Sequence, residues 1–140
     1  MESFVLSVDR SFKIKKEKLE LGLRSIGYHF DYWESDDNFL IRGDYKYSDG
    51  YIEAFGINNE ENISILKIEY SDLDQKDIDM MKIDDQNYKF YSFRYRNGTG
   101  FPFVKIFLFL LGCDIKKTFI DDNHGSITTL YDFLYNDEER

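Results

Sequence analysis

Apolar and polar residues alternate with a period of two in six stretches of this 140-residue chain. The stretches are rich in β-branched and aromatic residues, which favour a pleated, half-buried surface. We expect each to form a strand: 4–8, 28–34, 39–42, 51–57, 63–69 and 88–96. Residues 35–38 supply a hairpin turn between the second and third strands. We expect the sharpest turn at Asp49-Gly50, inside a polar link over 44–50.

Helical spacing replaces the alternation near the N-terminus. Apolar residues recur every three or four positions from Leu19 to Ile26, and Lys and Glu residues fill many of the positions around them. This spacing predicts an amphipathic helix over about 12–26. We expect Ser11 to cap its start and Gly27, which tolerates a positive φ, to end it.

The stretch from Phe101 to Cys113 is the longest nearly continuous apolar run in the chain. It is too short to cross a bilayer, which needs about 20 apolar residues, and it contains Lys105. Pro102 falls in the first turn of the expected helix, where its missing N–H has no helical partner. We therefore expect a buried helix over about 101–113, with the other elements packed around it.

The remaining segments complete an α+β pattern. We expect a short acidic helix over about 72–85, strands over 118–122 and 127–130, and a strand or short helix over 131–135. Strands clustered between helices, without strict βαβ alternation, predict a single α+β domain spanning 1–140. Its sheet should be mainly antiparallel, with the helices on one face.

The net charge of −9 is concentrated in the middle of the chain. Residues 31–85 hold sixteen acidic and five basic residues, a net −11, whereas 1–30 and 86–140 carry +2 and 0. Such a negative field repels nucleic acid and anionic membranes, and it speeds association with cationic partners. A solvated surface that keeps a small protein soluble explains the same charge equally well.

Cys113 is the single cysteine of the chain, which excludes an internal disulfide and favours a reducing compartment. Its place at the end of the apolar run suits a small buried hydrophobe. The first residues do not resemble a signal peptide. We therefore expect a cytoplasmic protein.

Asp121, Asp122 and His124 form the most suggestive cluster for catalysis, because carboxylate pairs and imidazoles serve metal sites and acid–base chemistry. The same Asp-Asp-Asn-His-Gly sequence is typical of a hairpin turn, in which Asp and Asn bond their own backbone. We favour the turn and expect no cofactor. A small hydrolase or metal-dependent enzyme that uses these three residues is the alternative. A pair of Cys113 and His124 is a weaker candidate for nucleophilic catalysis.

The strand predicted over 88–96 places Lys89, Arg94 and Arg96 among five aromatic residues. RNA-binding sheets combine aromatic and basic residues in this way. The negative net charge opposes RNA binding, so we expect these aromatic residues to fill a core and expect no nucleic-acid partner.

A stretch over 28–53 combines aromatic residues with carboxylates. Aromatic anchors in an acidic surround are typical of surfaces that dock a cationic protein. The expected partner-binding residues are Asp31, Trp33, Glu34, Asp36, Asp37, Asp44, Tyr45, Tyr47 and Asp49. The alternative is that Tyr and Trp side chains here partly cover the edges of a small sheet.

An apolar helix followed by Phe119-Ile120-Asp121-Asp122 and a His124-Gly125-Ser126 turn resembles small acidic bacterial immunity proteins. The likeness spans about Phe101 to Ile127. It implies a tight one-to-one complex with a basic toxin domain of an interbacterial, contact-dependent system. On this basis we expect a non-catalytic protein-binding module, an immunity protein or antitoxin; a regulatory subunit is a further alternative.

Overall fold

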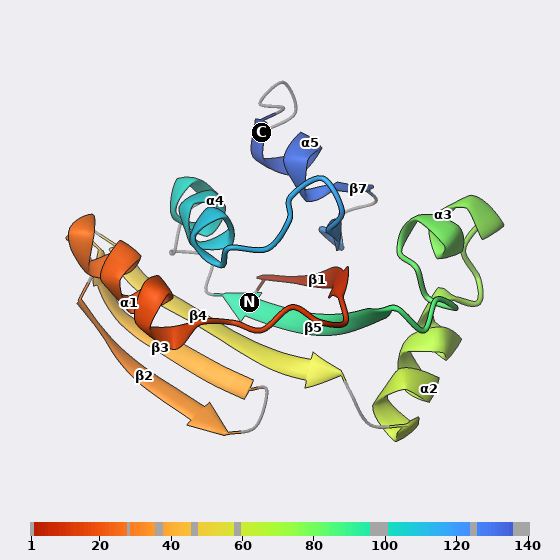
Figure 1. Ribbon diagram of the computed structural model, residues 1–140, viewed down its shortest axis with the longest axis horizontal. Coiled ribbons are helices and arrows are strands. Elements are labelled where there is room, and N and C mark those ends of the chain that lie inside the picture. The colour runs from red at the N-terminus through yellow and green to blue at the C-terminus, as the bar shows by residue number, and fades with distance from the viewer. Residues whose placement is uncertain are drawn as a thin grey trace.

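The computed structural model describes residues 2–27, 29–35, 38–45, 48–57, 60–95, 101–123 and 126–135, and the side chains of 3–27, 52–57, 60–95, 104–123 and 126–135. The described strands are β1 (Glu2–Asp9), β2 (His29–Ser35), β3 (Asn38–Tyr45), β4 (Ser48–Ile57), β5 (Tyr88–Tyr95), β6 (Phe119–Asp121) and β7 (Ile127–Thr129). The described helices are α1 (Lys16–Ser25), α2 (Glu60–Tyr70), α3 (Gln75–Met80), α4 (Phe101–Leu110) and α5 (Leu130–Tyr135) (Figure 1).

The seven described strands form one antiparallel sheet in the order β2-β3-β4-β5-β1-β6-β7. β1 lies in its interior, because it pairs along its whole length with β5 and, through Val5 to Ser7, with β6. Strands were predicted from the alternating pattern where β2, β3 and β4 lie, and the strands β6 and β7 were predicted separately over 118–122 and 127–130. The α+β class and the mainly antiparallel sheet are confirmed.

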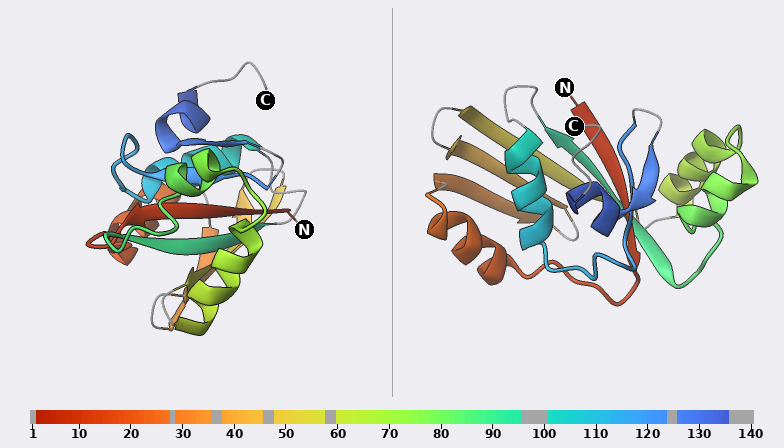
Figure 2. Two further views of the ribbon diagram at one scale, coloured as in Figure 1. Left: turned by 90° about the vertical axis from the view of Figure 1, so that its right-hand side faces the viewer. Right: turned by 90° about the horizontal axis from the view of Figure 1, so that it is seen from above.

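The larger core lies between the sheet and the helices α1, α4 and α5 (Figure 2). The rings of Phe4 and Phe93 stack with their centroids 4.8 Å apart. Phe107 of α4 meets Phe93 edge-on at 6.1 Å, and both side chains are fully buried. The apolar run is therefore the core helix that was expected, although the helix itself ends at Leu110.

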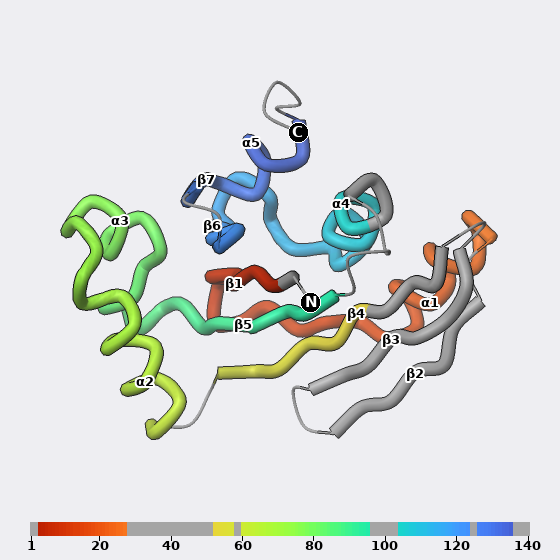
Figure 3. Tube along the Cα trace, turned by 180° about the vertical axis from the view of Figure 1, so that it is seen from behind, coloured from red at the N-terminus to blue at the C-terminus, as the bar shows by residue number. Residues whose placement is uncertain are grey.

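A smaller core lies on the opposite face of the same sheet. Val5 and Phe90 alternate with the residues of the larger core, so their side chains emerge on the other side. They pack against Leu66 and Tyr70 of α2 and against Met81, which follows α3. Figure 3 shows α2 and α3 beside each other at one end of the molecule, on the left of the view. The expectation of helices on one face only is wrong, because β1 and β5 carry apolar residues on both faces and need cover on both.

The predicted strand over 63–69 is wrong, because these residues form the middle of α2. Ile63, Leu66 and Tyr70 are three and four residues apart, so one helix face carries all three. Leu66 and Tyr70 are buried in the smaller core, and that burial overrides the strand preference of the isoleucines.

Two local predictions near turns are also wrong. Asp49-Gly50 lies inside β4, where Gly50 pairs with Gly43, and the connection between β3 and β4 falls at 46–47, outside the described residues. Ser11 does not cap α1, which begins at Lys16. Instead the Ser11 N–H and hydroxyl donate to the Asp9 carboxylate and hold the pKa of Asp9 below its ordinary value.

The N-terminal helix otherwise follows its prediction. It buries Leu19 and Leu23 against the larger core. It ends before Gly27, whose φ of +85° is the left-handed conformation expected of a terminating glycine. The short acidic helix and the C-terminal element are helical as α3 and α5.

Candidate protein-docking surface

One face of the β2-β3-β4 meander lies opposite the larger core. Ile52 and Ala54 of β4 are fully buried, and they share their face with the positions of β3 and β2 that pair in line with them. The other face carries the odd-numbered positions of β2 and β4 and the even-numbered positions of β3; we call it the open face. Figure 1 shows α1 and α4 on the core side of these strands, with α2 beyond the end of β4.

The register brings four of the nine predicted binding residues onto the open face. Asp31 is in line with Arg42 and Trp33 with Leu40, whereas Asp44 lies directly opposite Asp49. These four acidic and aromatic positions therefore share one face of the meander.

Two of the other five predicted residues lie on the opposite face of the meander. Glu34 pairs with Phe39, which is in line with buried Ala54, so the Glu34 position belongs to the core-side face. The Tyr45 position shares that face. Asp36, Asp37 and Tyr47 lie outside the described residues.

The side chains of the open face are described where β4 and β5 reach it. Phe55 is 37% exposed, although it is a phenylalanine in a strand of the sheet. The Arg94 guanidinium carbon lies 5.9 Å from the centre of the Phe55 ring, and Arg94 Nη1 lies 4.0 Å from Glu53 Oε1. An aromatic ring beside an arginine is the composition typical of interface hot spots.

A groove of about 270 Å³ separates this part of the open face from α2. Phe55 and Arg94 line it from the sheet, and Ile65 and Glu69 line it from the helix. Val5 and the buried Leu66 also line it, together with the polar residues Asn62 and Ser92. Sequence reasoning missed this groove, since it assigned residues 63–69 to a strand.

The helix α2 exposes two large apolar residues, one of which also lines the groove. Ile65 is 49% exposed and Ile68 is 70% exposed. They lie one helical turn apart on the side of α2 that faces away from the smaller core. These exposed isoleucines made the pattern resemble a strand, and the described fold leaves both of them largely in solvent.

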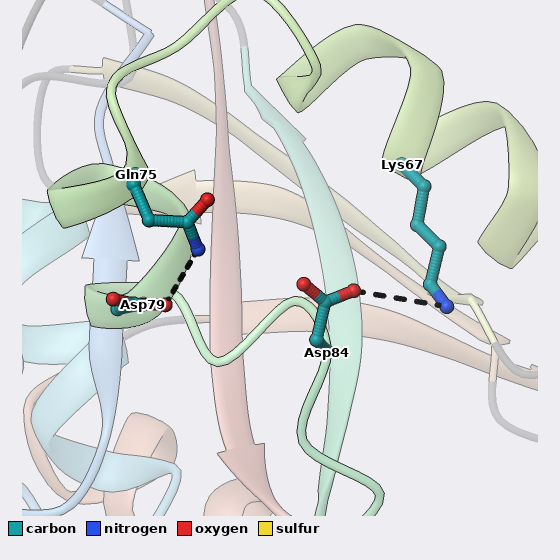
Figure 4. A network of polar contacts seen from close by, with 4 residues as sticks. All are labelled: Lys67, Gln75, Asp79 and Asp84. Carbon is teal, nitrogen blue, oxygen red and sulfur yellow. Dashed lines mark hydrogen bonds and ion pairs between the residues drawn. The ribbon is translucent and has the colours of Figure 1, made fainter.

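The charges near α2 are unevenly compensated. Lys67 extends toward Asp84, with the ammonium nitrogen 4.0 Å from a carboxylate oxygen, and Gln75 bonds Asp79 within α3 (Figure 4). By contrast, no described residue forms an ion pair with the exposed carboxylates of Glu60, Glu61 or Glu69. The helix therefore presents net negative charge beside the groove.

The carboxylates of the alternative catalytic cluster hold the β6-β7 connection together. Asp121 accepts hydrogen bonds from the Tyr70 hydroxyl and from the backbone N–H of Asn123, whose φ is +59°. Asp122, which is buried, accepts one from the backbone N–H of Ser126 at 3.2 Å. The two backbone contacts fit the turn predicted from the sequence, whereas the tyrosine contact joins β6 to α2. His124 lies outside the described residues.

The described side chains bear on three other kinds of site: a reactive thiol, a metal site and an RNA-binding sheet. Burial raises the pKa of the Cys113 thiol, against the opposing effect of a hydrogen bond with Thr118, so its thiolate is disfavoured. Within the described ranges, no group of three or more His, Cys, Asp and Glu residues is arranged to hold a metal ion. Of the five aromatic residues predicted to fill a core, Phe90, Tyr91, Phe93 and Tyr95 do so, whereas Tyr88 is only partly buried.

None of the helices that the structure describes has the length and apolar character needed to span a membrane. The chain matches no protein-family model, no curated protein and no solved structure. The candidate surface therefore stands on the geometry of this chain alone.

Proposed function

We propose that this chain is a non-catalytic protein-binding module that docks a cationic protein on the open face of β2-β3-β4. The observation that supports this most directly is the register, which aligns Asp31, Trp33, Asp44 and Asp49 on the face opposite the core. Of the classes of binding module, an immunity protein or antitoxin that neutralises a basic toxin domain accounts best for these features.

The physical argument combines two contributions. Aromatic side chains at the centre of an interface supply buried area at a low cost in conformational entropy, which favours affinity. Carboxylates around them steer a basic partner by long-range attraction and pair with its lysines and arginines. The segment 31–85, whose net charge is −11, contains most of the residues that this proposal uses.

The same proposal implies a cellular compartment, the absence of a cofactor and the partners that are disfavoured. The module acts in the cytoplasm, where its single cysteine remains reduced, and it requires no cofactor. Its negative charge disfavours nucleic acid and anionic membranes as partners. Blocking the active site of a basic toxin needs only a stable stoichiometric complex.

Co-expression with the product of each flanking gene tests the proposal. We expect one of these products to co-purify in a one-to-one complex that weakens as salt rises. Reversing charge on the open face, with Asp31→Lys and Asp44→Lys together, should weaken the complex at least tenfold, and so should Asp36→Lys with Asp37→Lys.

Glu17→Lys is the matched control, because Glu17 is an exposed carboxylate on α1. It should change affinity less than twofold. A complex that is indifferent to salt and to the reversals would remove the electrostatic basis of the proposal. The absence of any complex with either product would remove the proposal itself.

A further inference from the structure

The exposed side of α2 continues the open face around the end of the sheet. Phe55 stands on an open-face position of β4 and also lines the groove beside α2. On the helix side of that groove, Ile65 is half-exposed, and Ile68 lies one turn further along. Phe55 and Ile65 thus line one groove, Ile68 lies a turn beyond Ile65, and none of the three belongs to either core.

The groove suits a protein side chain better than a small molecule. Its volume of about 270 Å³ is below the range of about 300–1,000 Å³ usual for ligand pockets. Its lining combines apolar side chains with the polar side chains of Asn62, Glu69, Ser92 and Arg94. Apolar patches rimmed by polar groups mark surfaces where proteins associate.

The charges around the groove indicate which kind of molecule binds there. Arg94 and Lys67 each have a carboxylate at 4.0 Å, whereas no described residue pairs with Glu60, Glu61 or Glu69. A second copy of this chain would place these same carboxylates near one another across a two-fold interface, and both copies carry −9. A cationic segment meets no such repulsion.

We propose that α2 and its groove bind a segment of the cationic partner that inserts one apolar side chain between Phe55 and Ile65. Basic residues on either side of that apolar residue pair with Glu61 and Glu69. This inference rests on the proposed function and assigns a second contact region to the same partner. The partner then contacts both the open face and the outer side of α2.

Isothermal titration calorimetry with the co-purifying product of the flanking gene tests this. Ile65→Ser with Ile68→Ser should weaken binding at least tenfold, and so should Glu61→Lys with Glu69→Lys. Leu21→Ser and Glu17→Lys are the matched controls, since Leu21 is 71% exposed on α1, on the core side of the sheet. Each control should change affinity less than twofold.

The outcomes separate this inference from the proposed function. If the wild-type complex forms and tolerates both α2 variants, the inference fails and the proposed function stands. If no flanking product binds, both fail. A concentration-dependent dimer of the isolated chain, abolished by Ile65→Ser with Ile68→Ser, identifies a second copy as the occupant and overturns the inference. Circular dichroism melting of every variant checks that the fold is retained.

Discussion

Gly22 lies where α1 packs against α4. A Cβ atom added at this position would lie 2.7 Å from Cδ2 of Leu110, closer than packed atoms approach. The contact is with the end of a flexible, half-buried side chain, so Leu110 can shift at some cost in packing. Two effects of similar size therefore oppose each other, because replacing glycine by alanine within a helix favours folding by about 1 kcal/mol.

We expect Gly22→Ala to change the free energy of unfolding by less than about 0.5 kcal/mol in the wild-type chain. In a Leu110→Ala background the steric conflict is absent, and the same change should stabilise by about 1 kcal/mol. Urea unfolding of the four chains gives this double-mutant cycle. Equal effects in both backgrounds would show that the two side chains do not interact.

Tyr70 connects α2 to the β6 strand through its hydroxyl, which donates to Asp121. The residue is 4% exposed, and burial together with the Asp121 carboxylate raises the pKa of Tyr70 above its ordinary value. The folded chain therefore keeps this proton at a pH where the unfolded chain, with a pKa near 10, loses it. The resulting stabilisation is present in full below pH 10 and is lost as the pH rises above it.

Tyr70→Phe should cost about 1.5–3 kcal/mol at pH 7, the contribution of a hydrogen bond to a charged group. Above pH 10 the difference from wild type should shrink by up to about 1.4 kcal/mol per pH unit, because the variant has no proton to lose. Urea unfolding at pH 7, 9 and 10.5 measures this. Tyr131→Phe, at a 42% exposed position, is the control and should be close to neutral. A Tyr70→Phe cost that stays constant with pH would contradict the assignment.

At the scale of single elements, α4 buries one side and exposes part of the other. Phe107 is fully buried against Phe93, whereas Phe109, two residues later, is 58% exposed. Phe107→Ala should therefore destabilise the fold by about 3–5 kcal/mol, through lost burial and the cavity it leaves. Phe109→Ala should cost less than about 0.5 kcal/mol. Urea unfolding of both variants decides whether the helix is oriented as described.

The helix α2 marks the limit of what sequence pattern can predict for an element. β-Branched residues with rough alternation favour a strand, and Ile65 and Ile68 supply that signal although they lie on the exposed side of a helix. The helical pattern through Ile63, Leu66 and Tyr70 is present in the same residues. Only the position of the smaller core decides between the two patterns, and local sequence does not contain it.

Only part of the candidate site was predicted, again because local sequence does not show where the core lies. The composition of 28–53 identified acidic and aromatic residues, and strand alternation then places Asp31 and Trp33 on one face. The composition does not tell which face the core covers, so Glu34 and Tyr45 were grouped with the others. Phe55 and Ile65 were not predicted as site residues. A groove between a strand and a helix can be predicted only when both elements are assigned correctly, and residues 63–69 were assigned to a strand.

At the scale of the whole molecule, the sheet joins distant parts of the chain. β1 pairs with β5, whose partner residues are 79 to 93 positions later, and with β6 after more than a hundred. No local signal specifies such pairings, and the strand order was accordingly not predictable from the alternating pattern. The consequence for function is that β1 and β5 contribute buried residues to a core on each face, whereas the buried residues of β4, Ile52 and Ala54, lie on one face alone.

The net charge of the molecule should affect the rate at which the partner associates more than the rate at which it dissociates. Long-range attraction between a −9 chain and a cationic partner speeds encounter and is screened by salt. We expect the association rate constant, measured by stopped-flow fluorescence, to fall at least about tenfold between 20 and 300 mM salt. The dissociation rate should change much less.

Variants of α2 separate the effect of charge on association from the effect of apolar contacts on dissociation. Glu60→Lys with Glu61→Lys should lower the association rate, whereas Ile65→Ser with Ile68→Ser should raise the dissociation rate and leave association nearly unchanged, because apolar contacts form only after docking. Glu17→Lys changes the net charge by the same amount per residue from α1, so it measures the effect of total charge alone. If Glu17→Lys slows association as much per charge as the α2 reversals, the partner is attracted by the molecule's overall charge, and the carboxylates of α2 have no special place in its approach.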